Sequence, residues 1–362
     1  MWTEKLKQAN VSIHVIATGG GAGLQQQLWE MPGSSAYLSG CNFPYAMEEQ
    51  EELLGFMPEH FVSEEAAIDL ASAAYMKAYR FGGKNPIGLG LTASVASKKI
   101  HRGEHRVFVC AITNDSVKII HNTLEKGAGI LYRINDGKLC DYWGSYMLQD
   151  AAKIITYDNA KDATELARKR FFERPFFTAN GNRQATLPTN KRLALMSGAF
   201  NPLHEGHTSV AQHVMDQYGN TVAYEVTAEP PHKEAMTVQA LLQRAKLLQG
   251  YDRIFTKSYP YYLDKARAFP GVPLVLGADA MIRMLDPKWG TTPSELLNEF
   301  NKLNTKLLVS GRLVDGKFVS YTNILDHIDQ QDPSLVSLAL HVVAPVDGRI
   351  DISSTELRNK LA

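Results

Sequence analysis

Apolar and polar positions follow strand-like and helix-like patterns in turn along the first half of the chain. Short apolar runs occupy residues 11–16, 87–91 and 106–112, and runs of this length between turn residues are typical of buried strands. Ser63-Glu64-Glu65 precedes an apolar stretch at 66–79, which predicts a helix with a serine cap and early carboxylates that suit the helix dipole. Strands that alternate with helices indicate an α/β domain.

A polar stretch interrupts this pattern after about Phe177. Residues 178–190 are rich in Asn, Thr, Gly and Pro and show no apolar periodicity, so they are predicted to form a linker. A new apolar strand at 192–196 opens a second α/β pattern. Since the chain has 362 residues, more than one typical domain, we predict α/β domains at 1–177 and 191–362.

Composition limits the classes of function. Hydrophobic residues make up 44% and charged residues 21% of the chain, the balance of an ordinary globular protein. Lys+Arg and Asp+Glu both number 38, which argues against a nucleic-acid partner because such proteins usually carry a basic excess. Neither a signal sequence nor an apolar run of about 18 residues is found. We therefore expect a cytoplasmic protein without a membrane partner.

The three cysteines do not suggest a disulfide framework or a metal site. Cys41, Cys110 and Cys140 are odd in number and far apart in the sequence. No Cys-x-x-Cys pair is present, so a cysteine-rich zinc site is not expected. We predict no metal ligands among the protein side chains.

The segment richest in candidate chemistry follows the strand at 192–196. Residues 197–207 read Ser-Gly-Ala-Phe-Asn-Pro-Leu-His-Glu-Gly-His, and residues 208–218 are predicted to form a helix. His204 and His207 therefore lie at a strand-to-helix junction, where exposed amides and the helix dipole favour phosphate. Two imidazoles in that position can donate hydrogen bonds to phosphoryl oxygens and stabilise developing charge.

A second polar segment lies near the C-terminus, at 351–358. Ser353, Ser354 and Thr355 precede Leu357 and indicate another helix N-terminus. Arg358 adds a planar guanidinium to the same region. Hydroxyls, free amides and an arginine together can hold a polyphosphate.

In this order and context, the two segments resemble the signature motifs of the HxGH nucleotidyltransferase superfamily. The Gly-x-Phe-Asn-Pro form of the first motif, Pro-Pro-His-Lys at 230–233 and Gly-Ala-Asp at 277–279 with Trp289 resemble nicotinate and nicotinamide mononucleotide adenylyltransferases. The resemblance covers nearly all of 192–361. It departs at Ala199, in the residues after Asp279 and over 291–319, which leaves the acceptor open.

The resemblance implies a C-terminal Rossmann-like, doubly wound domain that transfers an adenylyl group from ATP, with Mg²⁺, to a pyridine mononucleotide. It implies that His204, His207, Lys233 and Arg358 are the catalytic residues. The residues implied to bind the nucleotide or pyrophosphate are Gly198, Phe200, Asn201, Gly206, Gly277, Asp279, Trp289, Ser353, Ser354 and Thr355. Lys233 as a plain surface lysine and Trp289 as a plain core aromatic are the competing interpretations.

Two further hypotheses for the function of the C-terminal half are compatible with the sequence. One is nucleotidyl transfer to another phosphorylated acceptor, since the superfamily also includes enzymes for phosphopantetheine, flavin and phosphocholine. The other is a protein that binds a nucleotide without catalysis. The intact histidine pair and the complete second motif favour an enzyme.

The N-terminal half contains a series of short motifs in a recognisable order. They are Thr18-Gly19-Gly20-Gly21, Pro32-Gly33-Ser34-Ser35-Ala36-Tyr37, Tyr45, Val62-Ser63-Glu64-Glu65-Ala66 and Gly90-Leu91-Thr92. The series resembles the CinA C-terminal family over residues 10–150, and active members of that family are nicotinamide mononucleotide amidohydrolases. The resemblance implies a CinA C-terminal-like α/β domain.

The catalytic residues of that family are altered in this chain. The family's serine falls on Thr18 or Ile16, depending on the alignment, and its lysine falls on Gln50. Because an amide side chain cannot act as a base, we predict a domain that is weak or inactive as a deamidase. It would serve instead as a ligand-binding or oligomerising module, and a homo-oligomer is expected.

Overall fold

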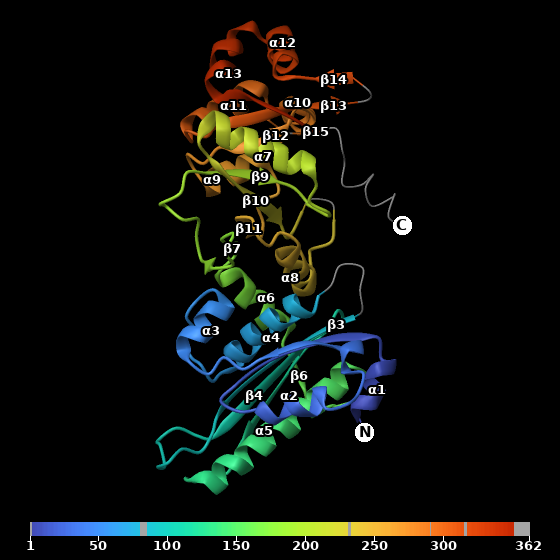
Figure 1. Cartoon of the computed structure of the whole chain (residues 1–362). Helices are drawn as coiled ribbons and strands as arrows, with labels where there is room; N and C mark the ends of the chain where they lie inside the picture. Colours follow the sequence, from blue (N-terminus) through green and yellow to red (C-terminus); the bar gives the residue numbers. More distant parts are fainter. Residues whose placement is uncertain (1, 80–84, 231–232, 290, 315–316, 351–362) are drawn as a thin grey trace. The chain divides into compact units, whose positions relative to one another are not determined.

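The computed structural model describes residues 2–79, 85–230, 233–289, 291–314 and 317–350, and it divides into two compact units (Figure 1). The first unit comprises 1–174, 181–185 and 236–246, and the second comprises 175–180, 186–235 and 247–362. The chain therefore passes between the units several times, whereas the sequence pattern predicts one passage at 178–190.

The additional passages follow from tertiary contacts that local sequence patterns do not encode. Within the first unit, the Gln243 side chain donates a hydrogen bond to the hydroxyl of Tyr75 at 2.7 Å. Arg183 is buried and donates to the carbonyl oxygen of Phe171 at 3.0 Å. These contacts hold 236–246 and 181–185 with the first unit.

The sheet of the first unit has the order β2-β1-β3-β4-β5-β6. Its strands are β1 (Val11–Thr18), β2 (Leu38–Asn42), β3 (Asn85–Ser94), β4 (Arg106–Ile112), β5 (Val117–Thr123) and β6 (Lys161–Asp162). β1 is parallel to β2 and β3, and the pairs from β3 to β6 are antiparallel. The predicted strands at 11–16, 87–91 and 106–112 are confirmed.

The helices of this unit include the predicted serine-capped helix, α4 (Glu64–Ala78), in which Ser63 Oγ accepts a hydrogen bond from the Ala66 amide at 3.1 Å. The other elements are α1 (Trp2–Gln8), α2 (Ala22–Trp29), η1 (Ser34–Ala36), α3 (Met47–Leu54), α5 (Ile130–Ala151), α6 (Thr164–Glu173), β8 (Arg183–Gln184) and most of α8 (Val238–Leu247). A Cβ on Gly88 would lie 2.2 Å from the Tyr75 amide nitrogen, so glycine in β3 allows α4 to pack closely.

The sheet of the second unit contains β14-β13-β12-β9-β10-β11-β7 in that order, with β15 beside β13. Its strands are β7 (Phe176–Phe177), β9 (Leu193–Ser197), β10 (Thr221–Thr227), β11 (Arg253–Thr256), β12 (Leu274–Gly277), β13 (Leu307–Val314), β14 (Lys317–Val319) and β15 (Val343–Ile350). β9 to β13 and β15 pair in parallel, and β7 and β14 are antiparallel additions.

The helices of the second unit connect these strands. They are α7 (Glu205–Tyr218), α9 (Tyr262–Ala268), α10 (Ala278–Leu285), η2 (Pro287–Trp289), α11 (Pro293–Lys302), α12 (Tyr321–Gln331), η3 (Pro333–Leu335) and α13 (Val336–Val342). The chain runs from β9 through β10 to β11 on one side, then continues with β12 and β13 on the other side of β9. β9 and β12 therefore border the switch point at which the sheet reverses its order.

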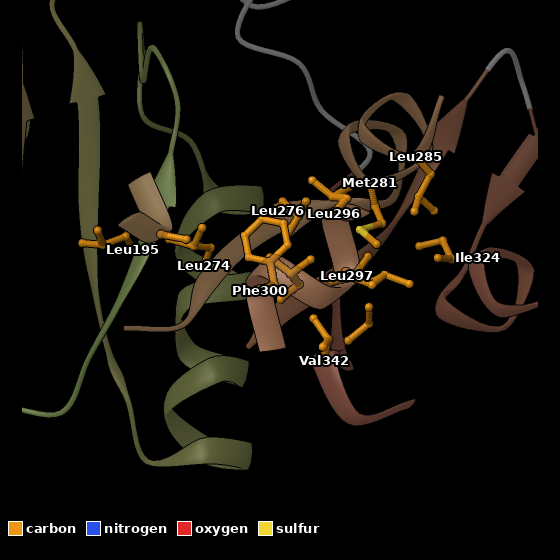
Figure 2. Packing of buried hydrophobic residues seen from close by; sticks show 14 of the residues in the cluster. Leu195, Leu274, Leu276, Met281, Leu285, Leu296, Leu297, Phe300, Ile324 and Val342 are labelled. Atoms are coloured by element: carbon orange, nitrogen blue, oxygen red, sulfur yellow. The ribbon is translucent and has the colours of Figure 1, made fainter. Parts of the chain in front are cut away.

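The core of the second unit packs α10, α11 and α12 against the sheet (Figure 2). Figure 2 shows Leu297 and Phe300 of α11 near Met281 of α10 and Ile324 of α12. All four side chains are fully buried. This core supports the strand ends from which the loops described below emerge.

Truncation within this core should destabilise the protein. Leu297→Ala should lower the free energy of unfolding by about 2–5 kcal/mol, since it removes buried methyl groups and leaves a cavity. Leu340→Ala, on α13 at 56% exposure, should cost less than about 0.5 kcal/mol. Urea unfolding of both variants beside the unmodified chain measures the difference, and equal losses would contradict the core assignment.

Candidate active site

The loop after β9 places both predicted histidines at the N-terminus of α7. His204 is the N-cap residue, with an extended backbone, and His207 lies in the first turn of the helix. Their ring centroids are 3.7 Å apart. The helix begins at Glu205, earlier than the predicted 208, because the His207 amide already donates to the carbonyl oxygen of His204 at 2.9 Å.

The two histidine rings are neutral near pH 7. The His204 amide donates to Nδ1 of His207 at 3.4 Å, so the neutral ring of His207 carries its proton on Nε2. Burial lowers the pKa of His207 to about 4, and the charges of His204 and Arg312 act in the same direction. Burial and Arg312 also lower the pKa of His204. The pair can therefore donate hydrogen bonds without contributing full positive charge.

The ring of Phe200 packs against the histidine loop. Its buried ring contacts the rings of His207 and Tyr224 edge-on, with centroid distances of 5.0 Å to each. A Cβ on Gly198 would lie 2.8 Å from Cζ of Phe200, so the loop requires glycine there. Gly206 is buried in the first turn of α7. Three of the predicted nucleotide-binding residues, Gly198, Phe200 and Gly206, therefore help to shape the loop.

The end of β12 supplies an acidic side chain. Asp279 lies in the first turn of α10, two residues after the N-cap Gly277. Its carboxylate accepts hydrogen bonds from Arg283 Nη2 at 2.8 Å and from Arg312 Nη1 at 3.3 Å. The charge of Arg312 also lowers the pKa of both histidines. This arginine therefore interacts electrostatically with the histidine loop as well as with Asp279. Sequence reasoning missed Arg312, and the available signal was a basic residue shortly after the apolar run 307–309.

Both loops open on the same edge of the sheet. The histidine loop follows β9 and the Asp279 loop follows β12, which is its neighbour, and ligands of open α/β sheets bind at the carboxyl ends of strands at such a switch point. Ser197 Oγ, His204 Nδ1 and Ser310 Oγ are buried at this level without a hydrogen-bond partner among the described residues. Buried polar atoms of this kind need a ligand or water to satisfy them.

Part of the predicted site lies outside the described residues. This applies to Ser353, Ser354, Thr355 and Arg358 of the second motif and to the side chain of Trp289, whose backbone belongs to η2. Lys233 is described and its side chain is exposed. Asn201 is joined to Pro202 through a cis peptide bond. The roles of these residues stay predictions.

The first unit contains a second candidate site, a pocket of about 390 Å³ lined by residues that include Thr18, Tyr45, Gln50 and Arg133. Gln50 Nε2 donates to Thr18 Oγ1 at 3.2 Å, and both side chains are buried. Ile16, the alternative position for the family's serine, lies in the core. Thr18 is thus the residue at the pocket, with an amide rather than an amine beside it. Arg133, which sequence reasoning missed, donates to the Tyr45 hydroxyl at 3.0 Å.

Two negative findings apply to the described parts of the chain only. In those ranges, no helix is both long and apolar enough to cross a membrane. Within the same ranges, no group of three or more His, Cys, Asp or Glu side chains could hold a metal ion.

Residues 195–360 match the family model described as cytidylyltransferase-like. This part of the chain is a cytidylyltransferase-like domain. The match includes the histidine loop, the Asp279 loop and the polar segment at 351–358. The predicted resemblance of the C-terminal half to nucleotidyltransferases is therefore confirmed.

Short alignments relate the chain to two curated proteins. It is 44% identical over 50 residues to a "Probable nicotinate-nucleotide adenylyltransferase" from Rubrobacter xylanophilus, which covers 14% of this chain and 23% of that protein. It is 38% identical over 61 residues to a protein of the same description from Lactiplantibacillus plantarum, covering 17% and 29%. The chain thus aligns with about a quarter of the length of these relatives.

Solved structures of the competence-damage family are similar to a different part of the fold. A competence damage-inducible protein A from Klebsiella pneumoniae matches at 13% identity and a TM-score of 0.33, covering 41% of this chain and 93% of that one. A competence/damage-inducible protein from Agrobacterium tumefaciens matches at 15% identity and a TM-score of 0.31, covering 40% and 88%.

The lowered pKa of His207 predicts a stability that depends on pH. The unfolded chain takes up a proton on this residue near pH 6.5, whereas the folded cytidylyltransferase-like domain does so only near pH 4. Between these values the unfolded state binds the extra proton, so the free energy of unfolding should decrease as the pH falls. Urea unfolding at about pH 7 and about pH 5 measures this effect. The decrease in the free energy of unfolding between the two pH values should be smaller for His207→Gln than for the unmodified chain. Equal losses in the two proteins would contradict the assigned burial.

Proposed function

We propose that the cytidylyltransferase-like domain transfers the adenylyl group of ATP to nicotinate or nicotinamide mononucleotide and releases pyrophosphate. The observation that carries this proposal is the arrangement around the carboxyl ends of β9 and β12. Two neutral imidazoles lie at the N-terminus of α7, and an ion pair between Arg312 of β13 and Asp279 of α10 lies at the neighbouring strands. Ring N–H groups, helix amides and a guanidinium are the groups that bind polyphosphates.

In the proposed reaction, a phosphate oxygen of the mononucleotide attacks the α-phosphorus of ATP. The bond from that phosphorus to the bridging oxygen of the β-phosphate breaks, and its electron pair leaves with pyrophosphate. Negative charge grows on the leaving oxygen and on the α-phosphoryl oxygens. His204 and His207 would donate hydrogen bonds to these oxygens, so that positioning and electrostatic stabilisation supply the rate.

ATP would enter with Mg²⁺, which would supply positive charge to its phosphates. Magnesium is commonly held through substrate phosphates and one or two carboxylates while it keeps several waters. Asp279 is a carboxylate that the described residues supply at this edge. A single carboxylate fits a metal ion that is bound mainly by the phosphates of the nucleotide. Lys233 and Arg358 would add positive charge, and Ser353, Ser354 and Thr355 would hold the leaving pyrophosphate.

The choice of a pyridine mononucleotide as acceptor has two supports. The aligned relatives are described as nicotinate-nucleotide adenylyltransferases. The Pro-Pro-His-Lys run at 230–233 resembles the same family. Transfer to another phosphorylated acceptor is the second candidate, favoured by the altered residues that follow Asp279.

The proposal is tested by pyrophosphate release. Full-length protein is incubated with ATP, Mg²⁺ and either nicotinate or nicotinamide mononucleotide, beside a reaction without acceptor. Release that depends on one mononucleotide, with the matching dinucleotide as product, supports the proposal and identifies the acceptor. ATP binding without release in either reaction would contradict it.

The pocket of the first unit should not hydrolyse the amide of nicotinamide mononucleotide. Gln50 cannot take a proton from the Thr18 hydroxyl, so the full chain should release ammonia no faster than a buffer control. Gln50→Lys together with Thr18→Ser restores both side-chain types that the family uses, and it provides a positive comparison. Ammonia release at an enzymatic rate by the unmodified chain would overturn the prediction.

A further inference from the structure

The chain around Lys233 is attached to both units of the protein. Directly after β10, in the second unit, the Ala228 amide donates to the carbonyl oxygen of Thr256 at 2.8 Å. The chain enters the first unit at Met236 and stays there through most of α8. Lys233, which the proposed reaction uses, therefore lies between the two attachment points, three residues before the second of them.

Contacts within the first unit fix the second attachment point. The Arg168 guanidinium on α6 donates a hydrogen bond to the carbonyl oxygen of Met236. The next residue, Thr237, accepts a hydrogen bond from the Ala240 amide at 3.2 Å through its hydroxyl and so caps the first turn of α8. The backbone on the C-terminal side of Lys233 is thus held at Met236 and continues directly into a capped helix.

A hydrogen-bond network in the first unit holds α8 itself. Gln243 Nε2 donates to the Tyr75 hydroxyl at 2.7 Å and to Oδ1 of Asn114 at 3.3 Å. The Tyr75 hydroxyl donates to the same oxygen of Asn114 at 2.8 Å. Tyr75 is a fully buried residue of α4, and Asn114 lies between β4 and β5. Three separate parts of the first unit, α4, α6 and the turn between β4 and β5, therefore determine where α8 lies.

We infer that the first unit positions Lys233 for nucleotidyl transfer, with Gln243 and Tyr75 as positioning residues. The inference rests on the proposed function, in which Lys233 adds positive charge beside the phosphates. The side chain of Lys233 is exposed, and a lysine loses rotamer freedom when it is ordered by a ligand. A backbone that is already held on both sides lowers the cost of this ordering. The first unit, whose deamidase residues are altered, thereby has a role in the reaction of the second.

Loss of the network should displace Lys233 without removing it. When Gln243 no longer holds α8, the start of the helix can shift, and the backbone at Met236 shifts with it. A displacement of about 1 Å in a group that contacts the reacting atoms can slow a reaction by about 10²-fold. Since three residues separate Lys233 from Met236, only part of such a displacement should reach the lysine.

Substitutions in the full chain test the inference through the pyrophosphate assay. Gln243→Leu and Tyr75→Phe should each lower kcat/KM for ATP by about three- to tenfold, the range that corresponds to one hydrogen bond. Tyr37→Phe is the matched control, because Tyr37 is a second buried tyrosine of the first unit and its hydroxyl donates to the carbonyl oxygen of Leu28. This variant should keep the kcat/KM of the unmodified protein. Urea unfolding verifies that all three variants are folded.

A double-mutant cycle with Lys233→Ala separates positioning from a general contribution to the fold. If Tyr75 acts through Lys233, the addition of Tyr75→Phe to Lys233→Ala should lower kcat/KM by less than about twofold, because the lysine that it positions is absent. A purely structural effect would instead multiply with that of Lys233→Ala. The same cycle is measured on the dissociation constant for ATP, which requires no turnover.

Hydrogen exchange reports on the attachment itself. Amides of residues 233–242 should exchange faster in Gln243→Leu and Tyr75→Phe than in Tyr37→Phe, as measured by mass spectrometry of the peptides. Exchange and ATP affinity do not depend on the acceptor. A chain that binds ATP but releases no pyrophosphate would therefore contradict the proposed function, while these two measurements would still decide the role of the first unit.

Three results would overturn the inference. The first is an equal kcat/KM and an equal affinity for ATP in Tyr75→Phe and Tyr37→Phe. The second is a Lys233→Ala variant that changes neither quantity, or one in which the effect of Tyr75→Phe persists in full. The third is an exchange rate at residues 233–242 that neither Gln243→Leu nor Tyr75→Phe alters.

Discussion

Replacement of His207 with alanine is expected to lower kcat for pyrophosphate release by about 10²- to 10³-fold, as is typical when a donor to developing charge is removed. His207 is the residue at which helix position, ring orientation and protonation state combine. Its Nδ1 accepts from the His204 amide, and burial keeps the ring neutral. Nε2–H is thus preorganised to donate to a phosphoryl oxygen.

The kinetic pattern distinguishes this role from simple nucleotide binding. An interaction that strengthens in the transition state lowers kcat and kcat/KM together, whereas one that binds substrate and transition state equally raises KM alone. We expect the first pattern for His207→Ala. His213→Ala provides the control, because this histidine lies on the same helix and its Nδ1 is 2.8 Å from the carbonyl oxygen of Ser209. A kcat that is equal in both variants would exclude His207 from the reaction.

The histidine loop could be predicted from the sequence because its determinants are local. A strand, a glycine that must clear Phe200, and a helix whose first turn begins at His204 all lie within a short segment. Only the start of α7 differs from the prediction, since the first turn closes before the apolar periodicity begins. The same holds for α4, whose cap at Ser63 needs no distant partner.

Arg312 could not be predicted in the same way, because its position depends on the order of the strands. It reaches Asp279 only because β13 pairs with β12 in parallel. The segment that contains it departs from the family pattern, so resemblance offered no guide. The return of 236–246 to the first unit is a second example, since it rests on contacts with residues such as Tyr75 that are far away in the sequence.

The pocket of the first unit could be predicted from the sequence only in part. The resemblance alone left Thr18 and Ile16 as alternatives for the family's serine. The position along β1 decides between them, because Ile16 is buried in the core, whereas Thr18, at the end of the strand, meets Gln50 at the pocket. Arg133 joins this pocket from α5, and only the tertiary structure brings that helix to the end of β1.

Replacement of Arg312 with alanine should lower kcat/KM for ATP by about 10- to 100-fold, the effect of losing a hydrogen bond to a charged group. Arg283→Ala is the matched control. Both arginines contact the carboxylate of Asp279, but only Arg312 lowers the pKa of the two histidines. Loss of Arg283, whose side chain is 66% exposed, should therefore leave activity near that of the unmodified protein.

A second readout separates the charge of Arg312 from its contribution to the fold. Burial and His204 are the larger causes of the low pKa of His207, so removal of this positive charge should raise that pKa only slightly from about 4, and an NMR titration of the ring protons can follow the shift. Arg312→Lys keeps the charge but loses the planar fork, so it should preserve the low pKa of His207 and recover only part of kcat/KM. If Arg312→Ala and Arg283→Ala gave equal losses of activity and left the titration of His207 unchanged, Arg312 would be a partner of Asp279 only. The polyphosphate would then be held by the histidine loop and the segment at 351–358.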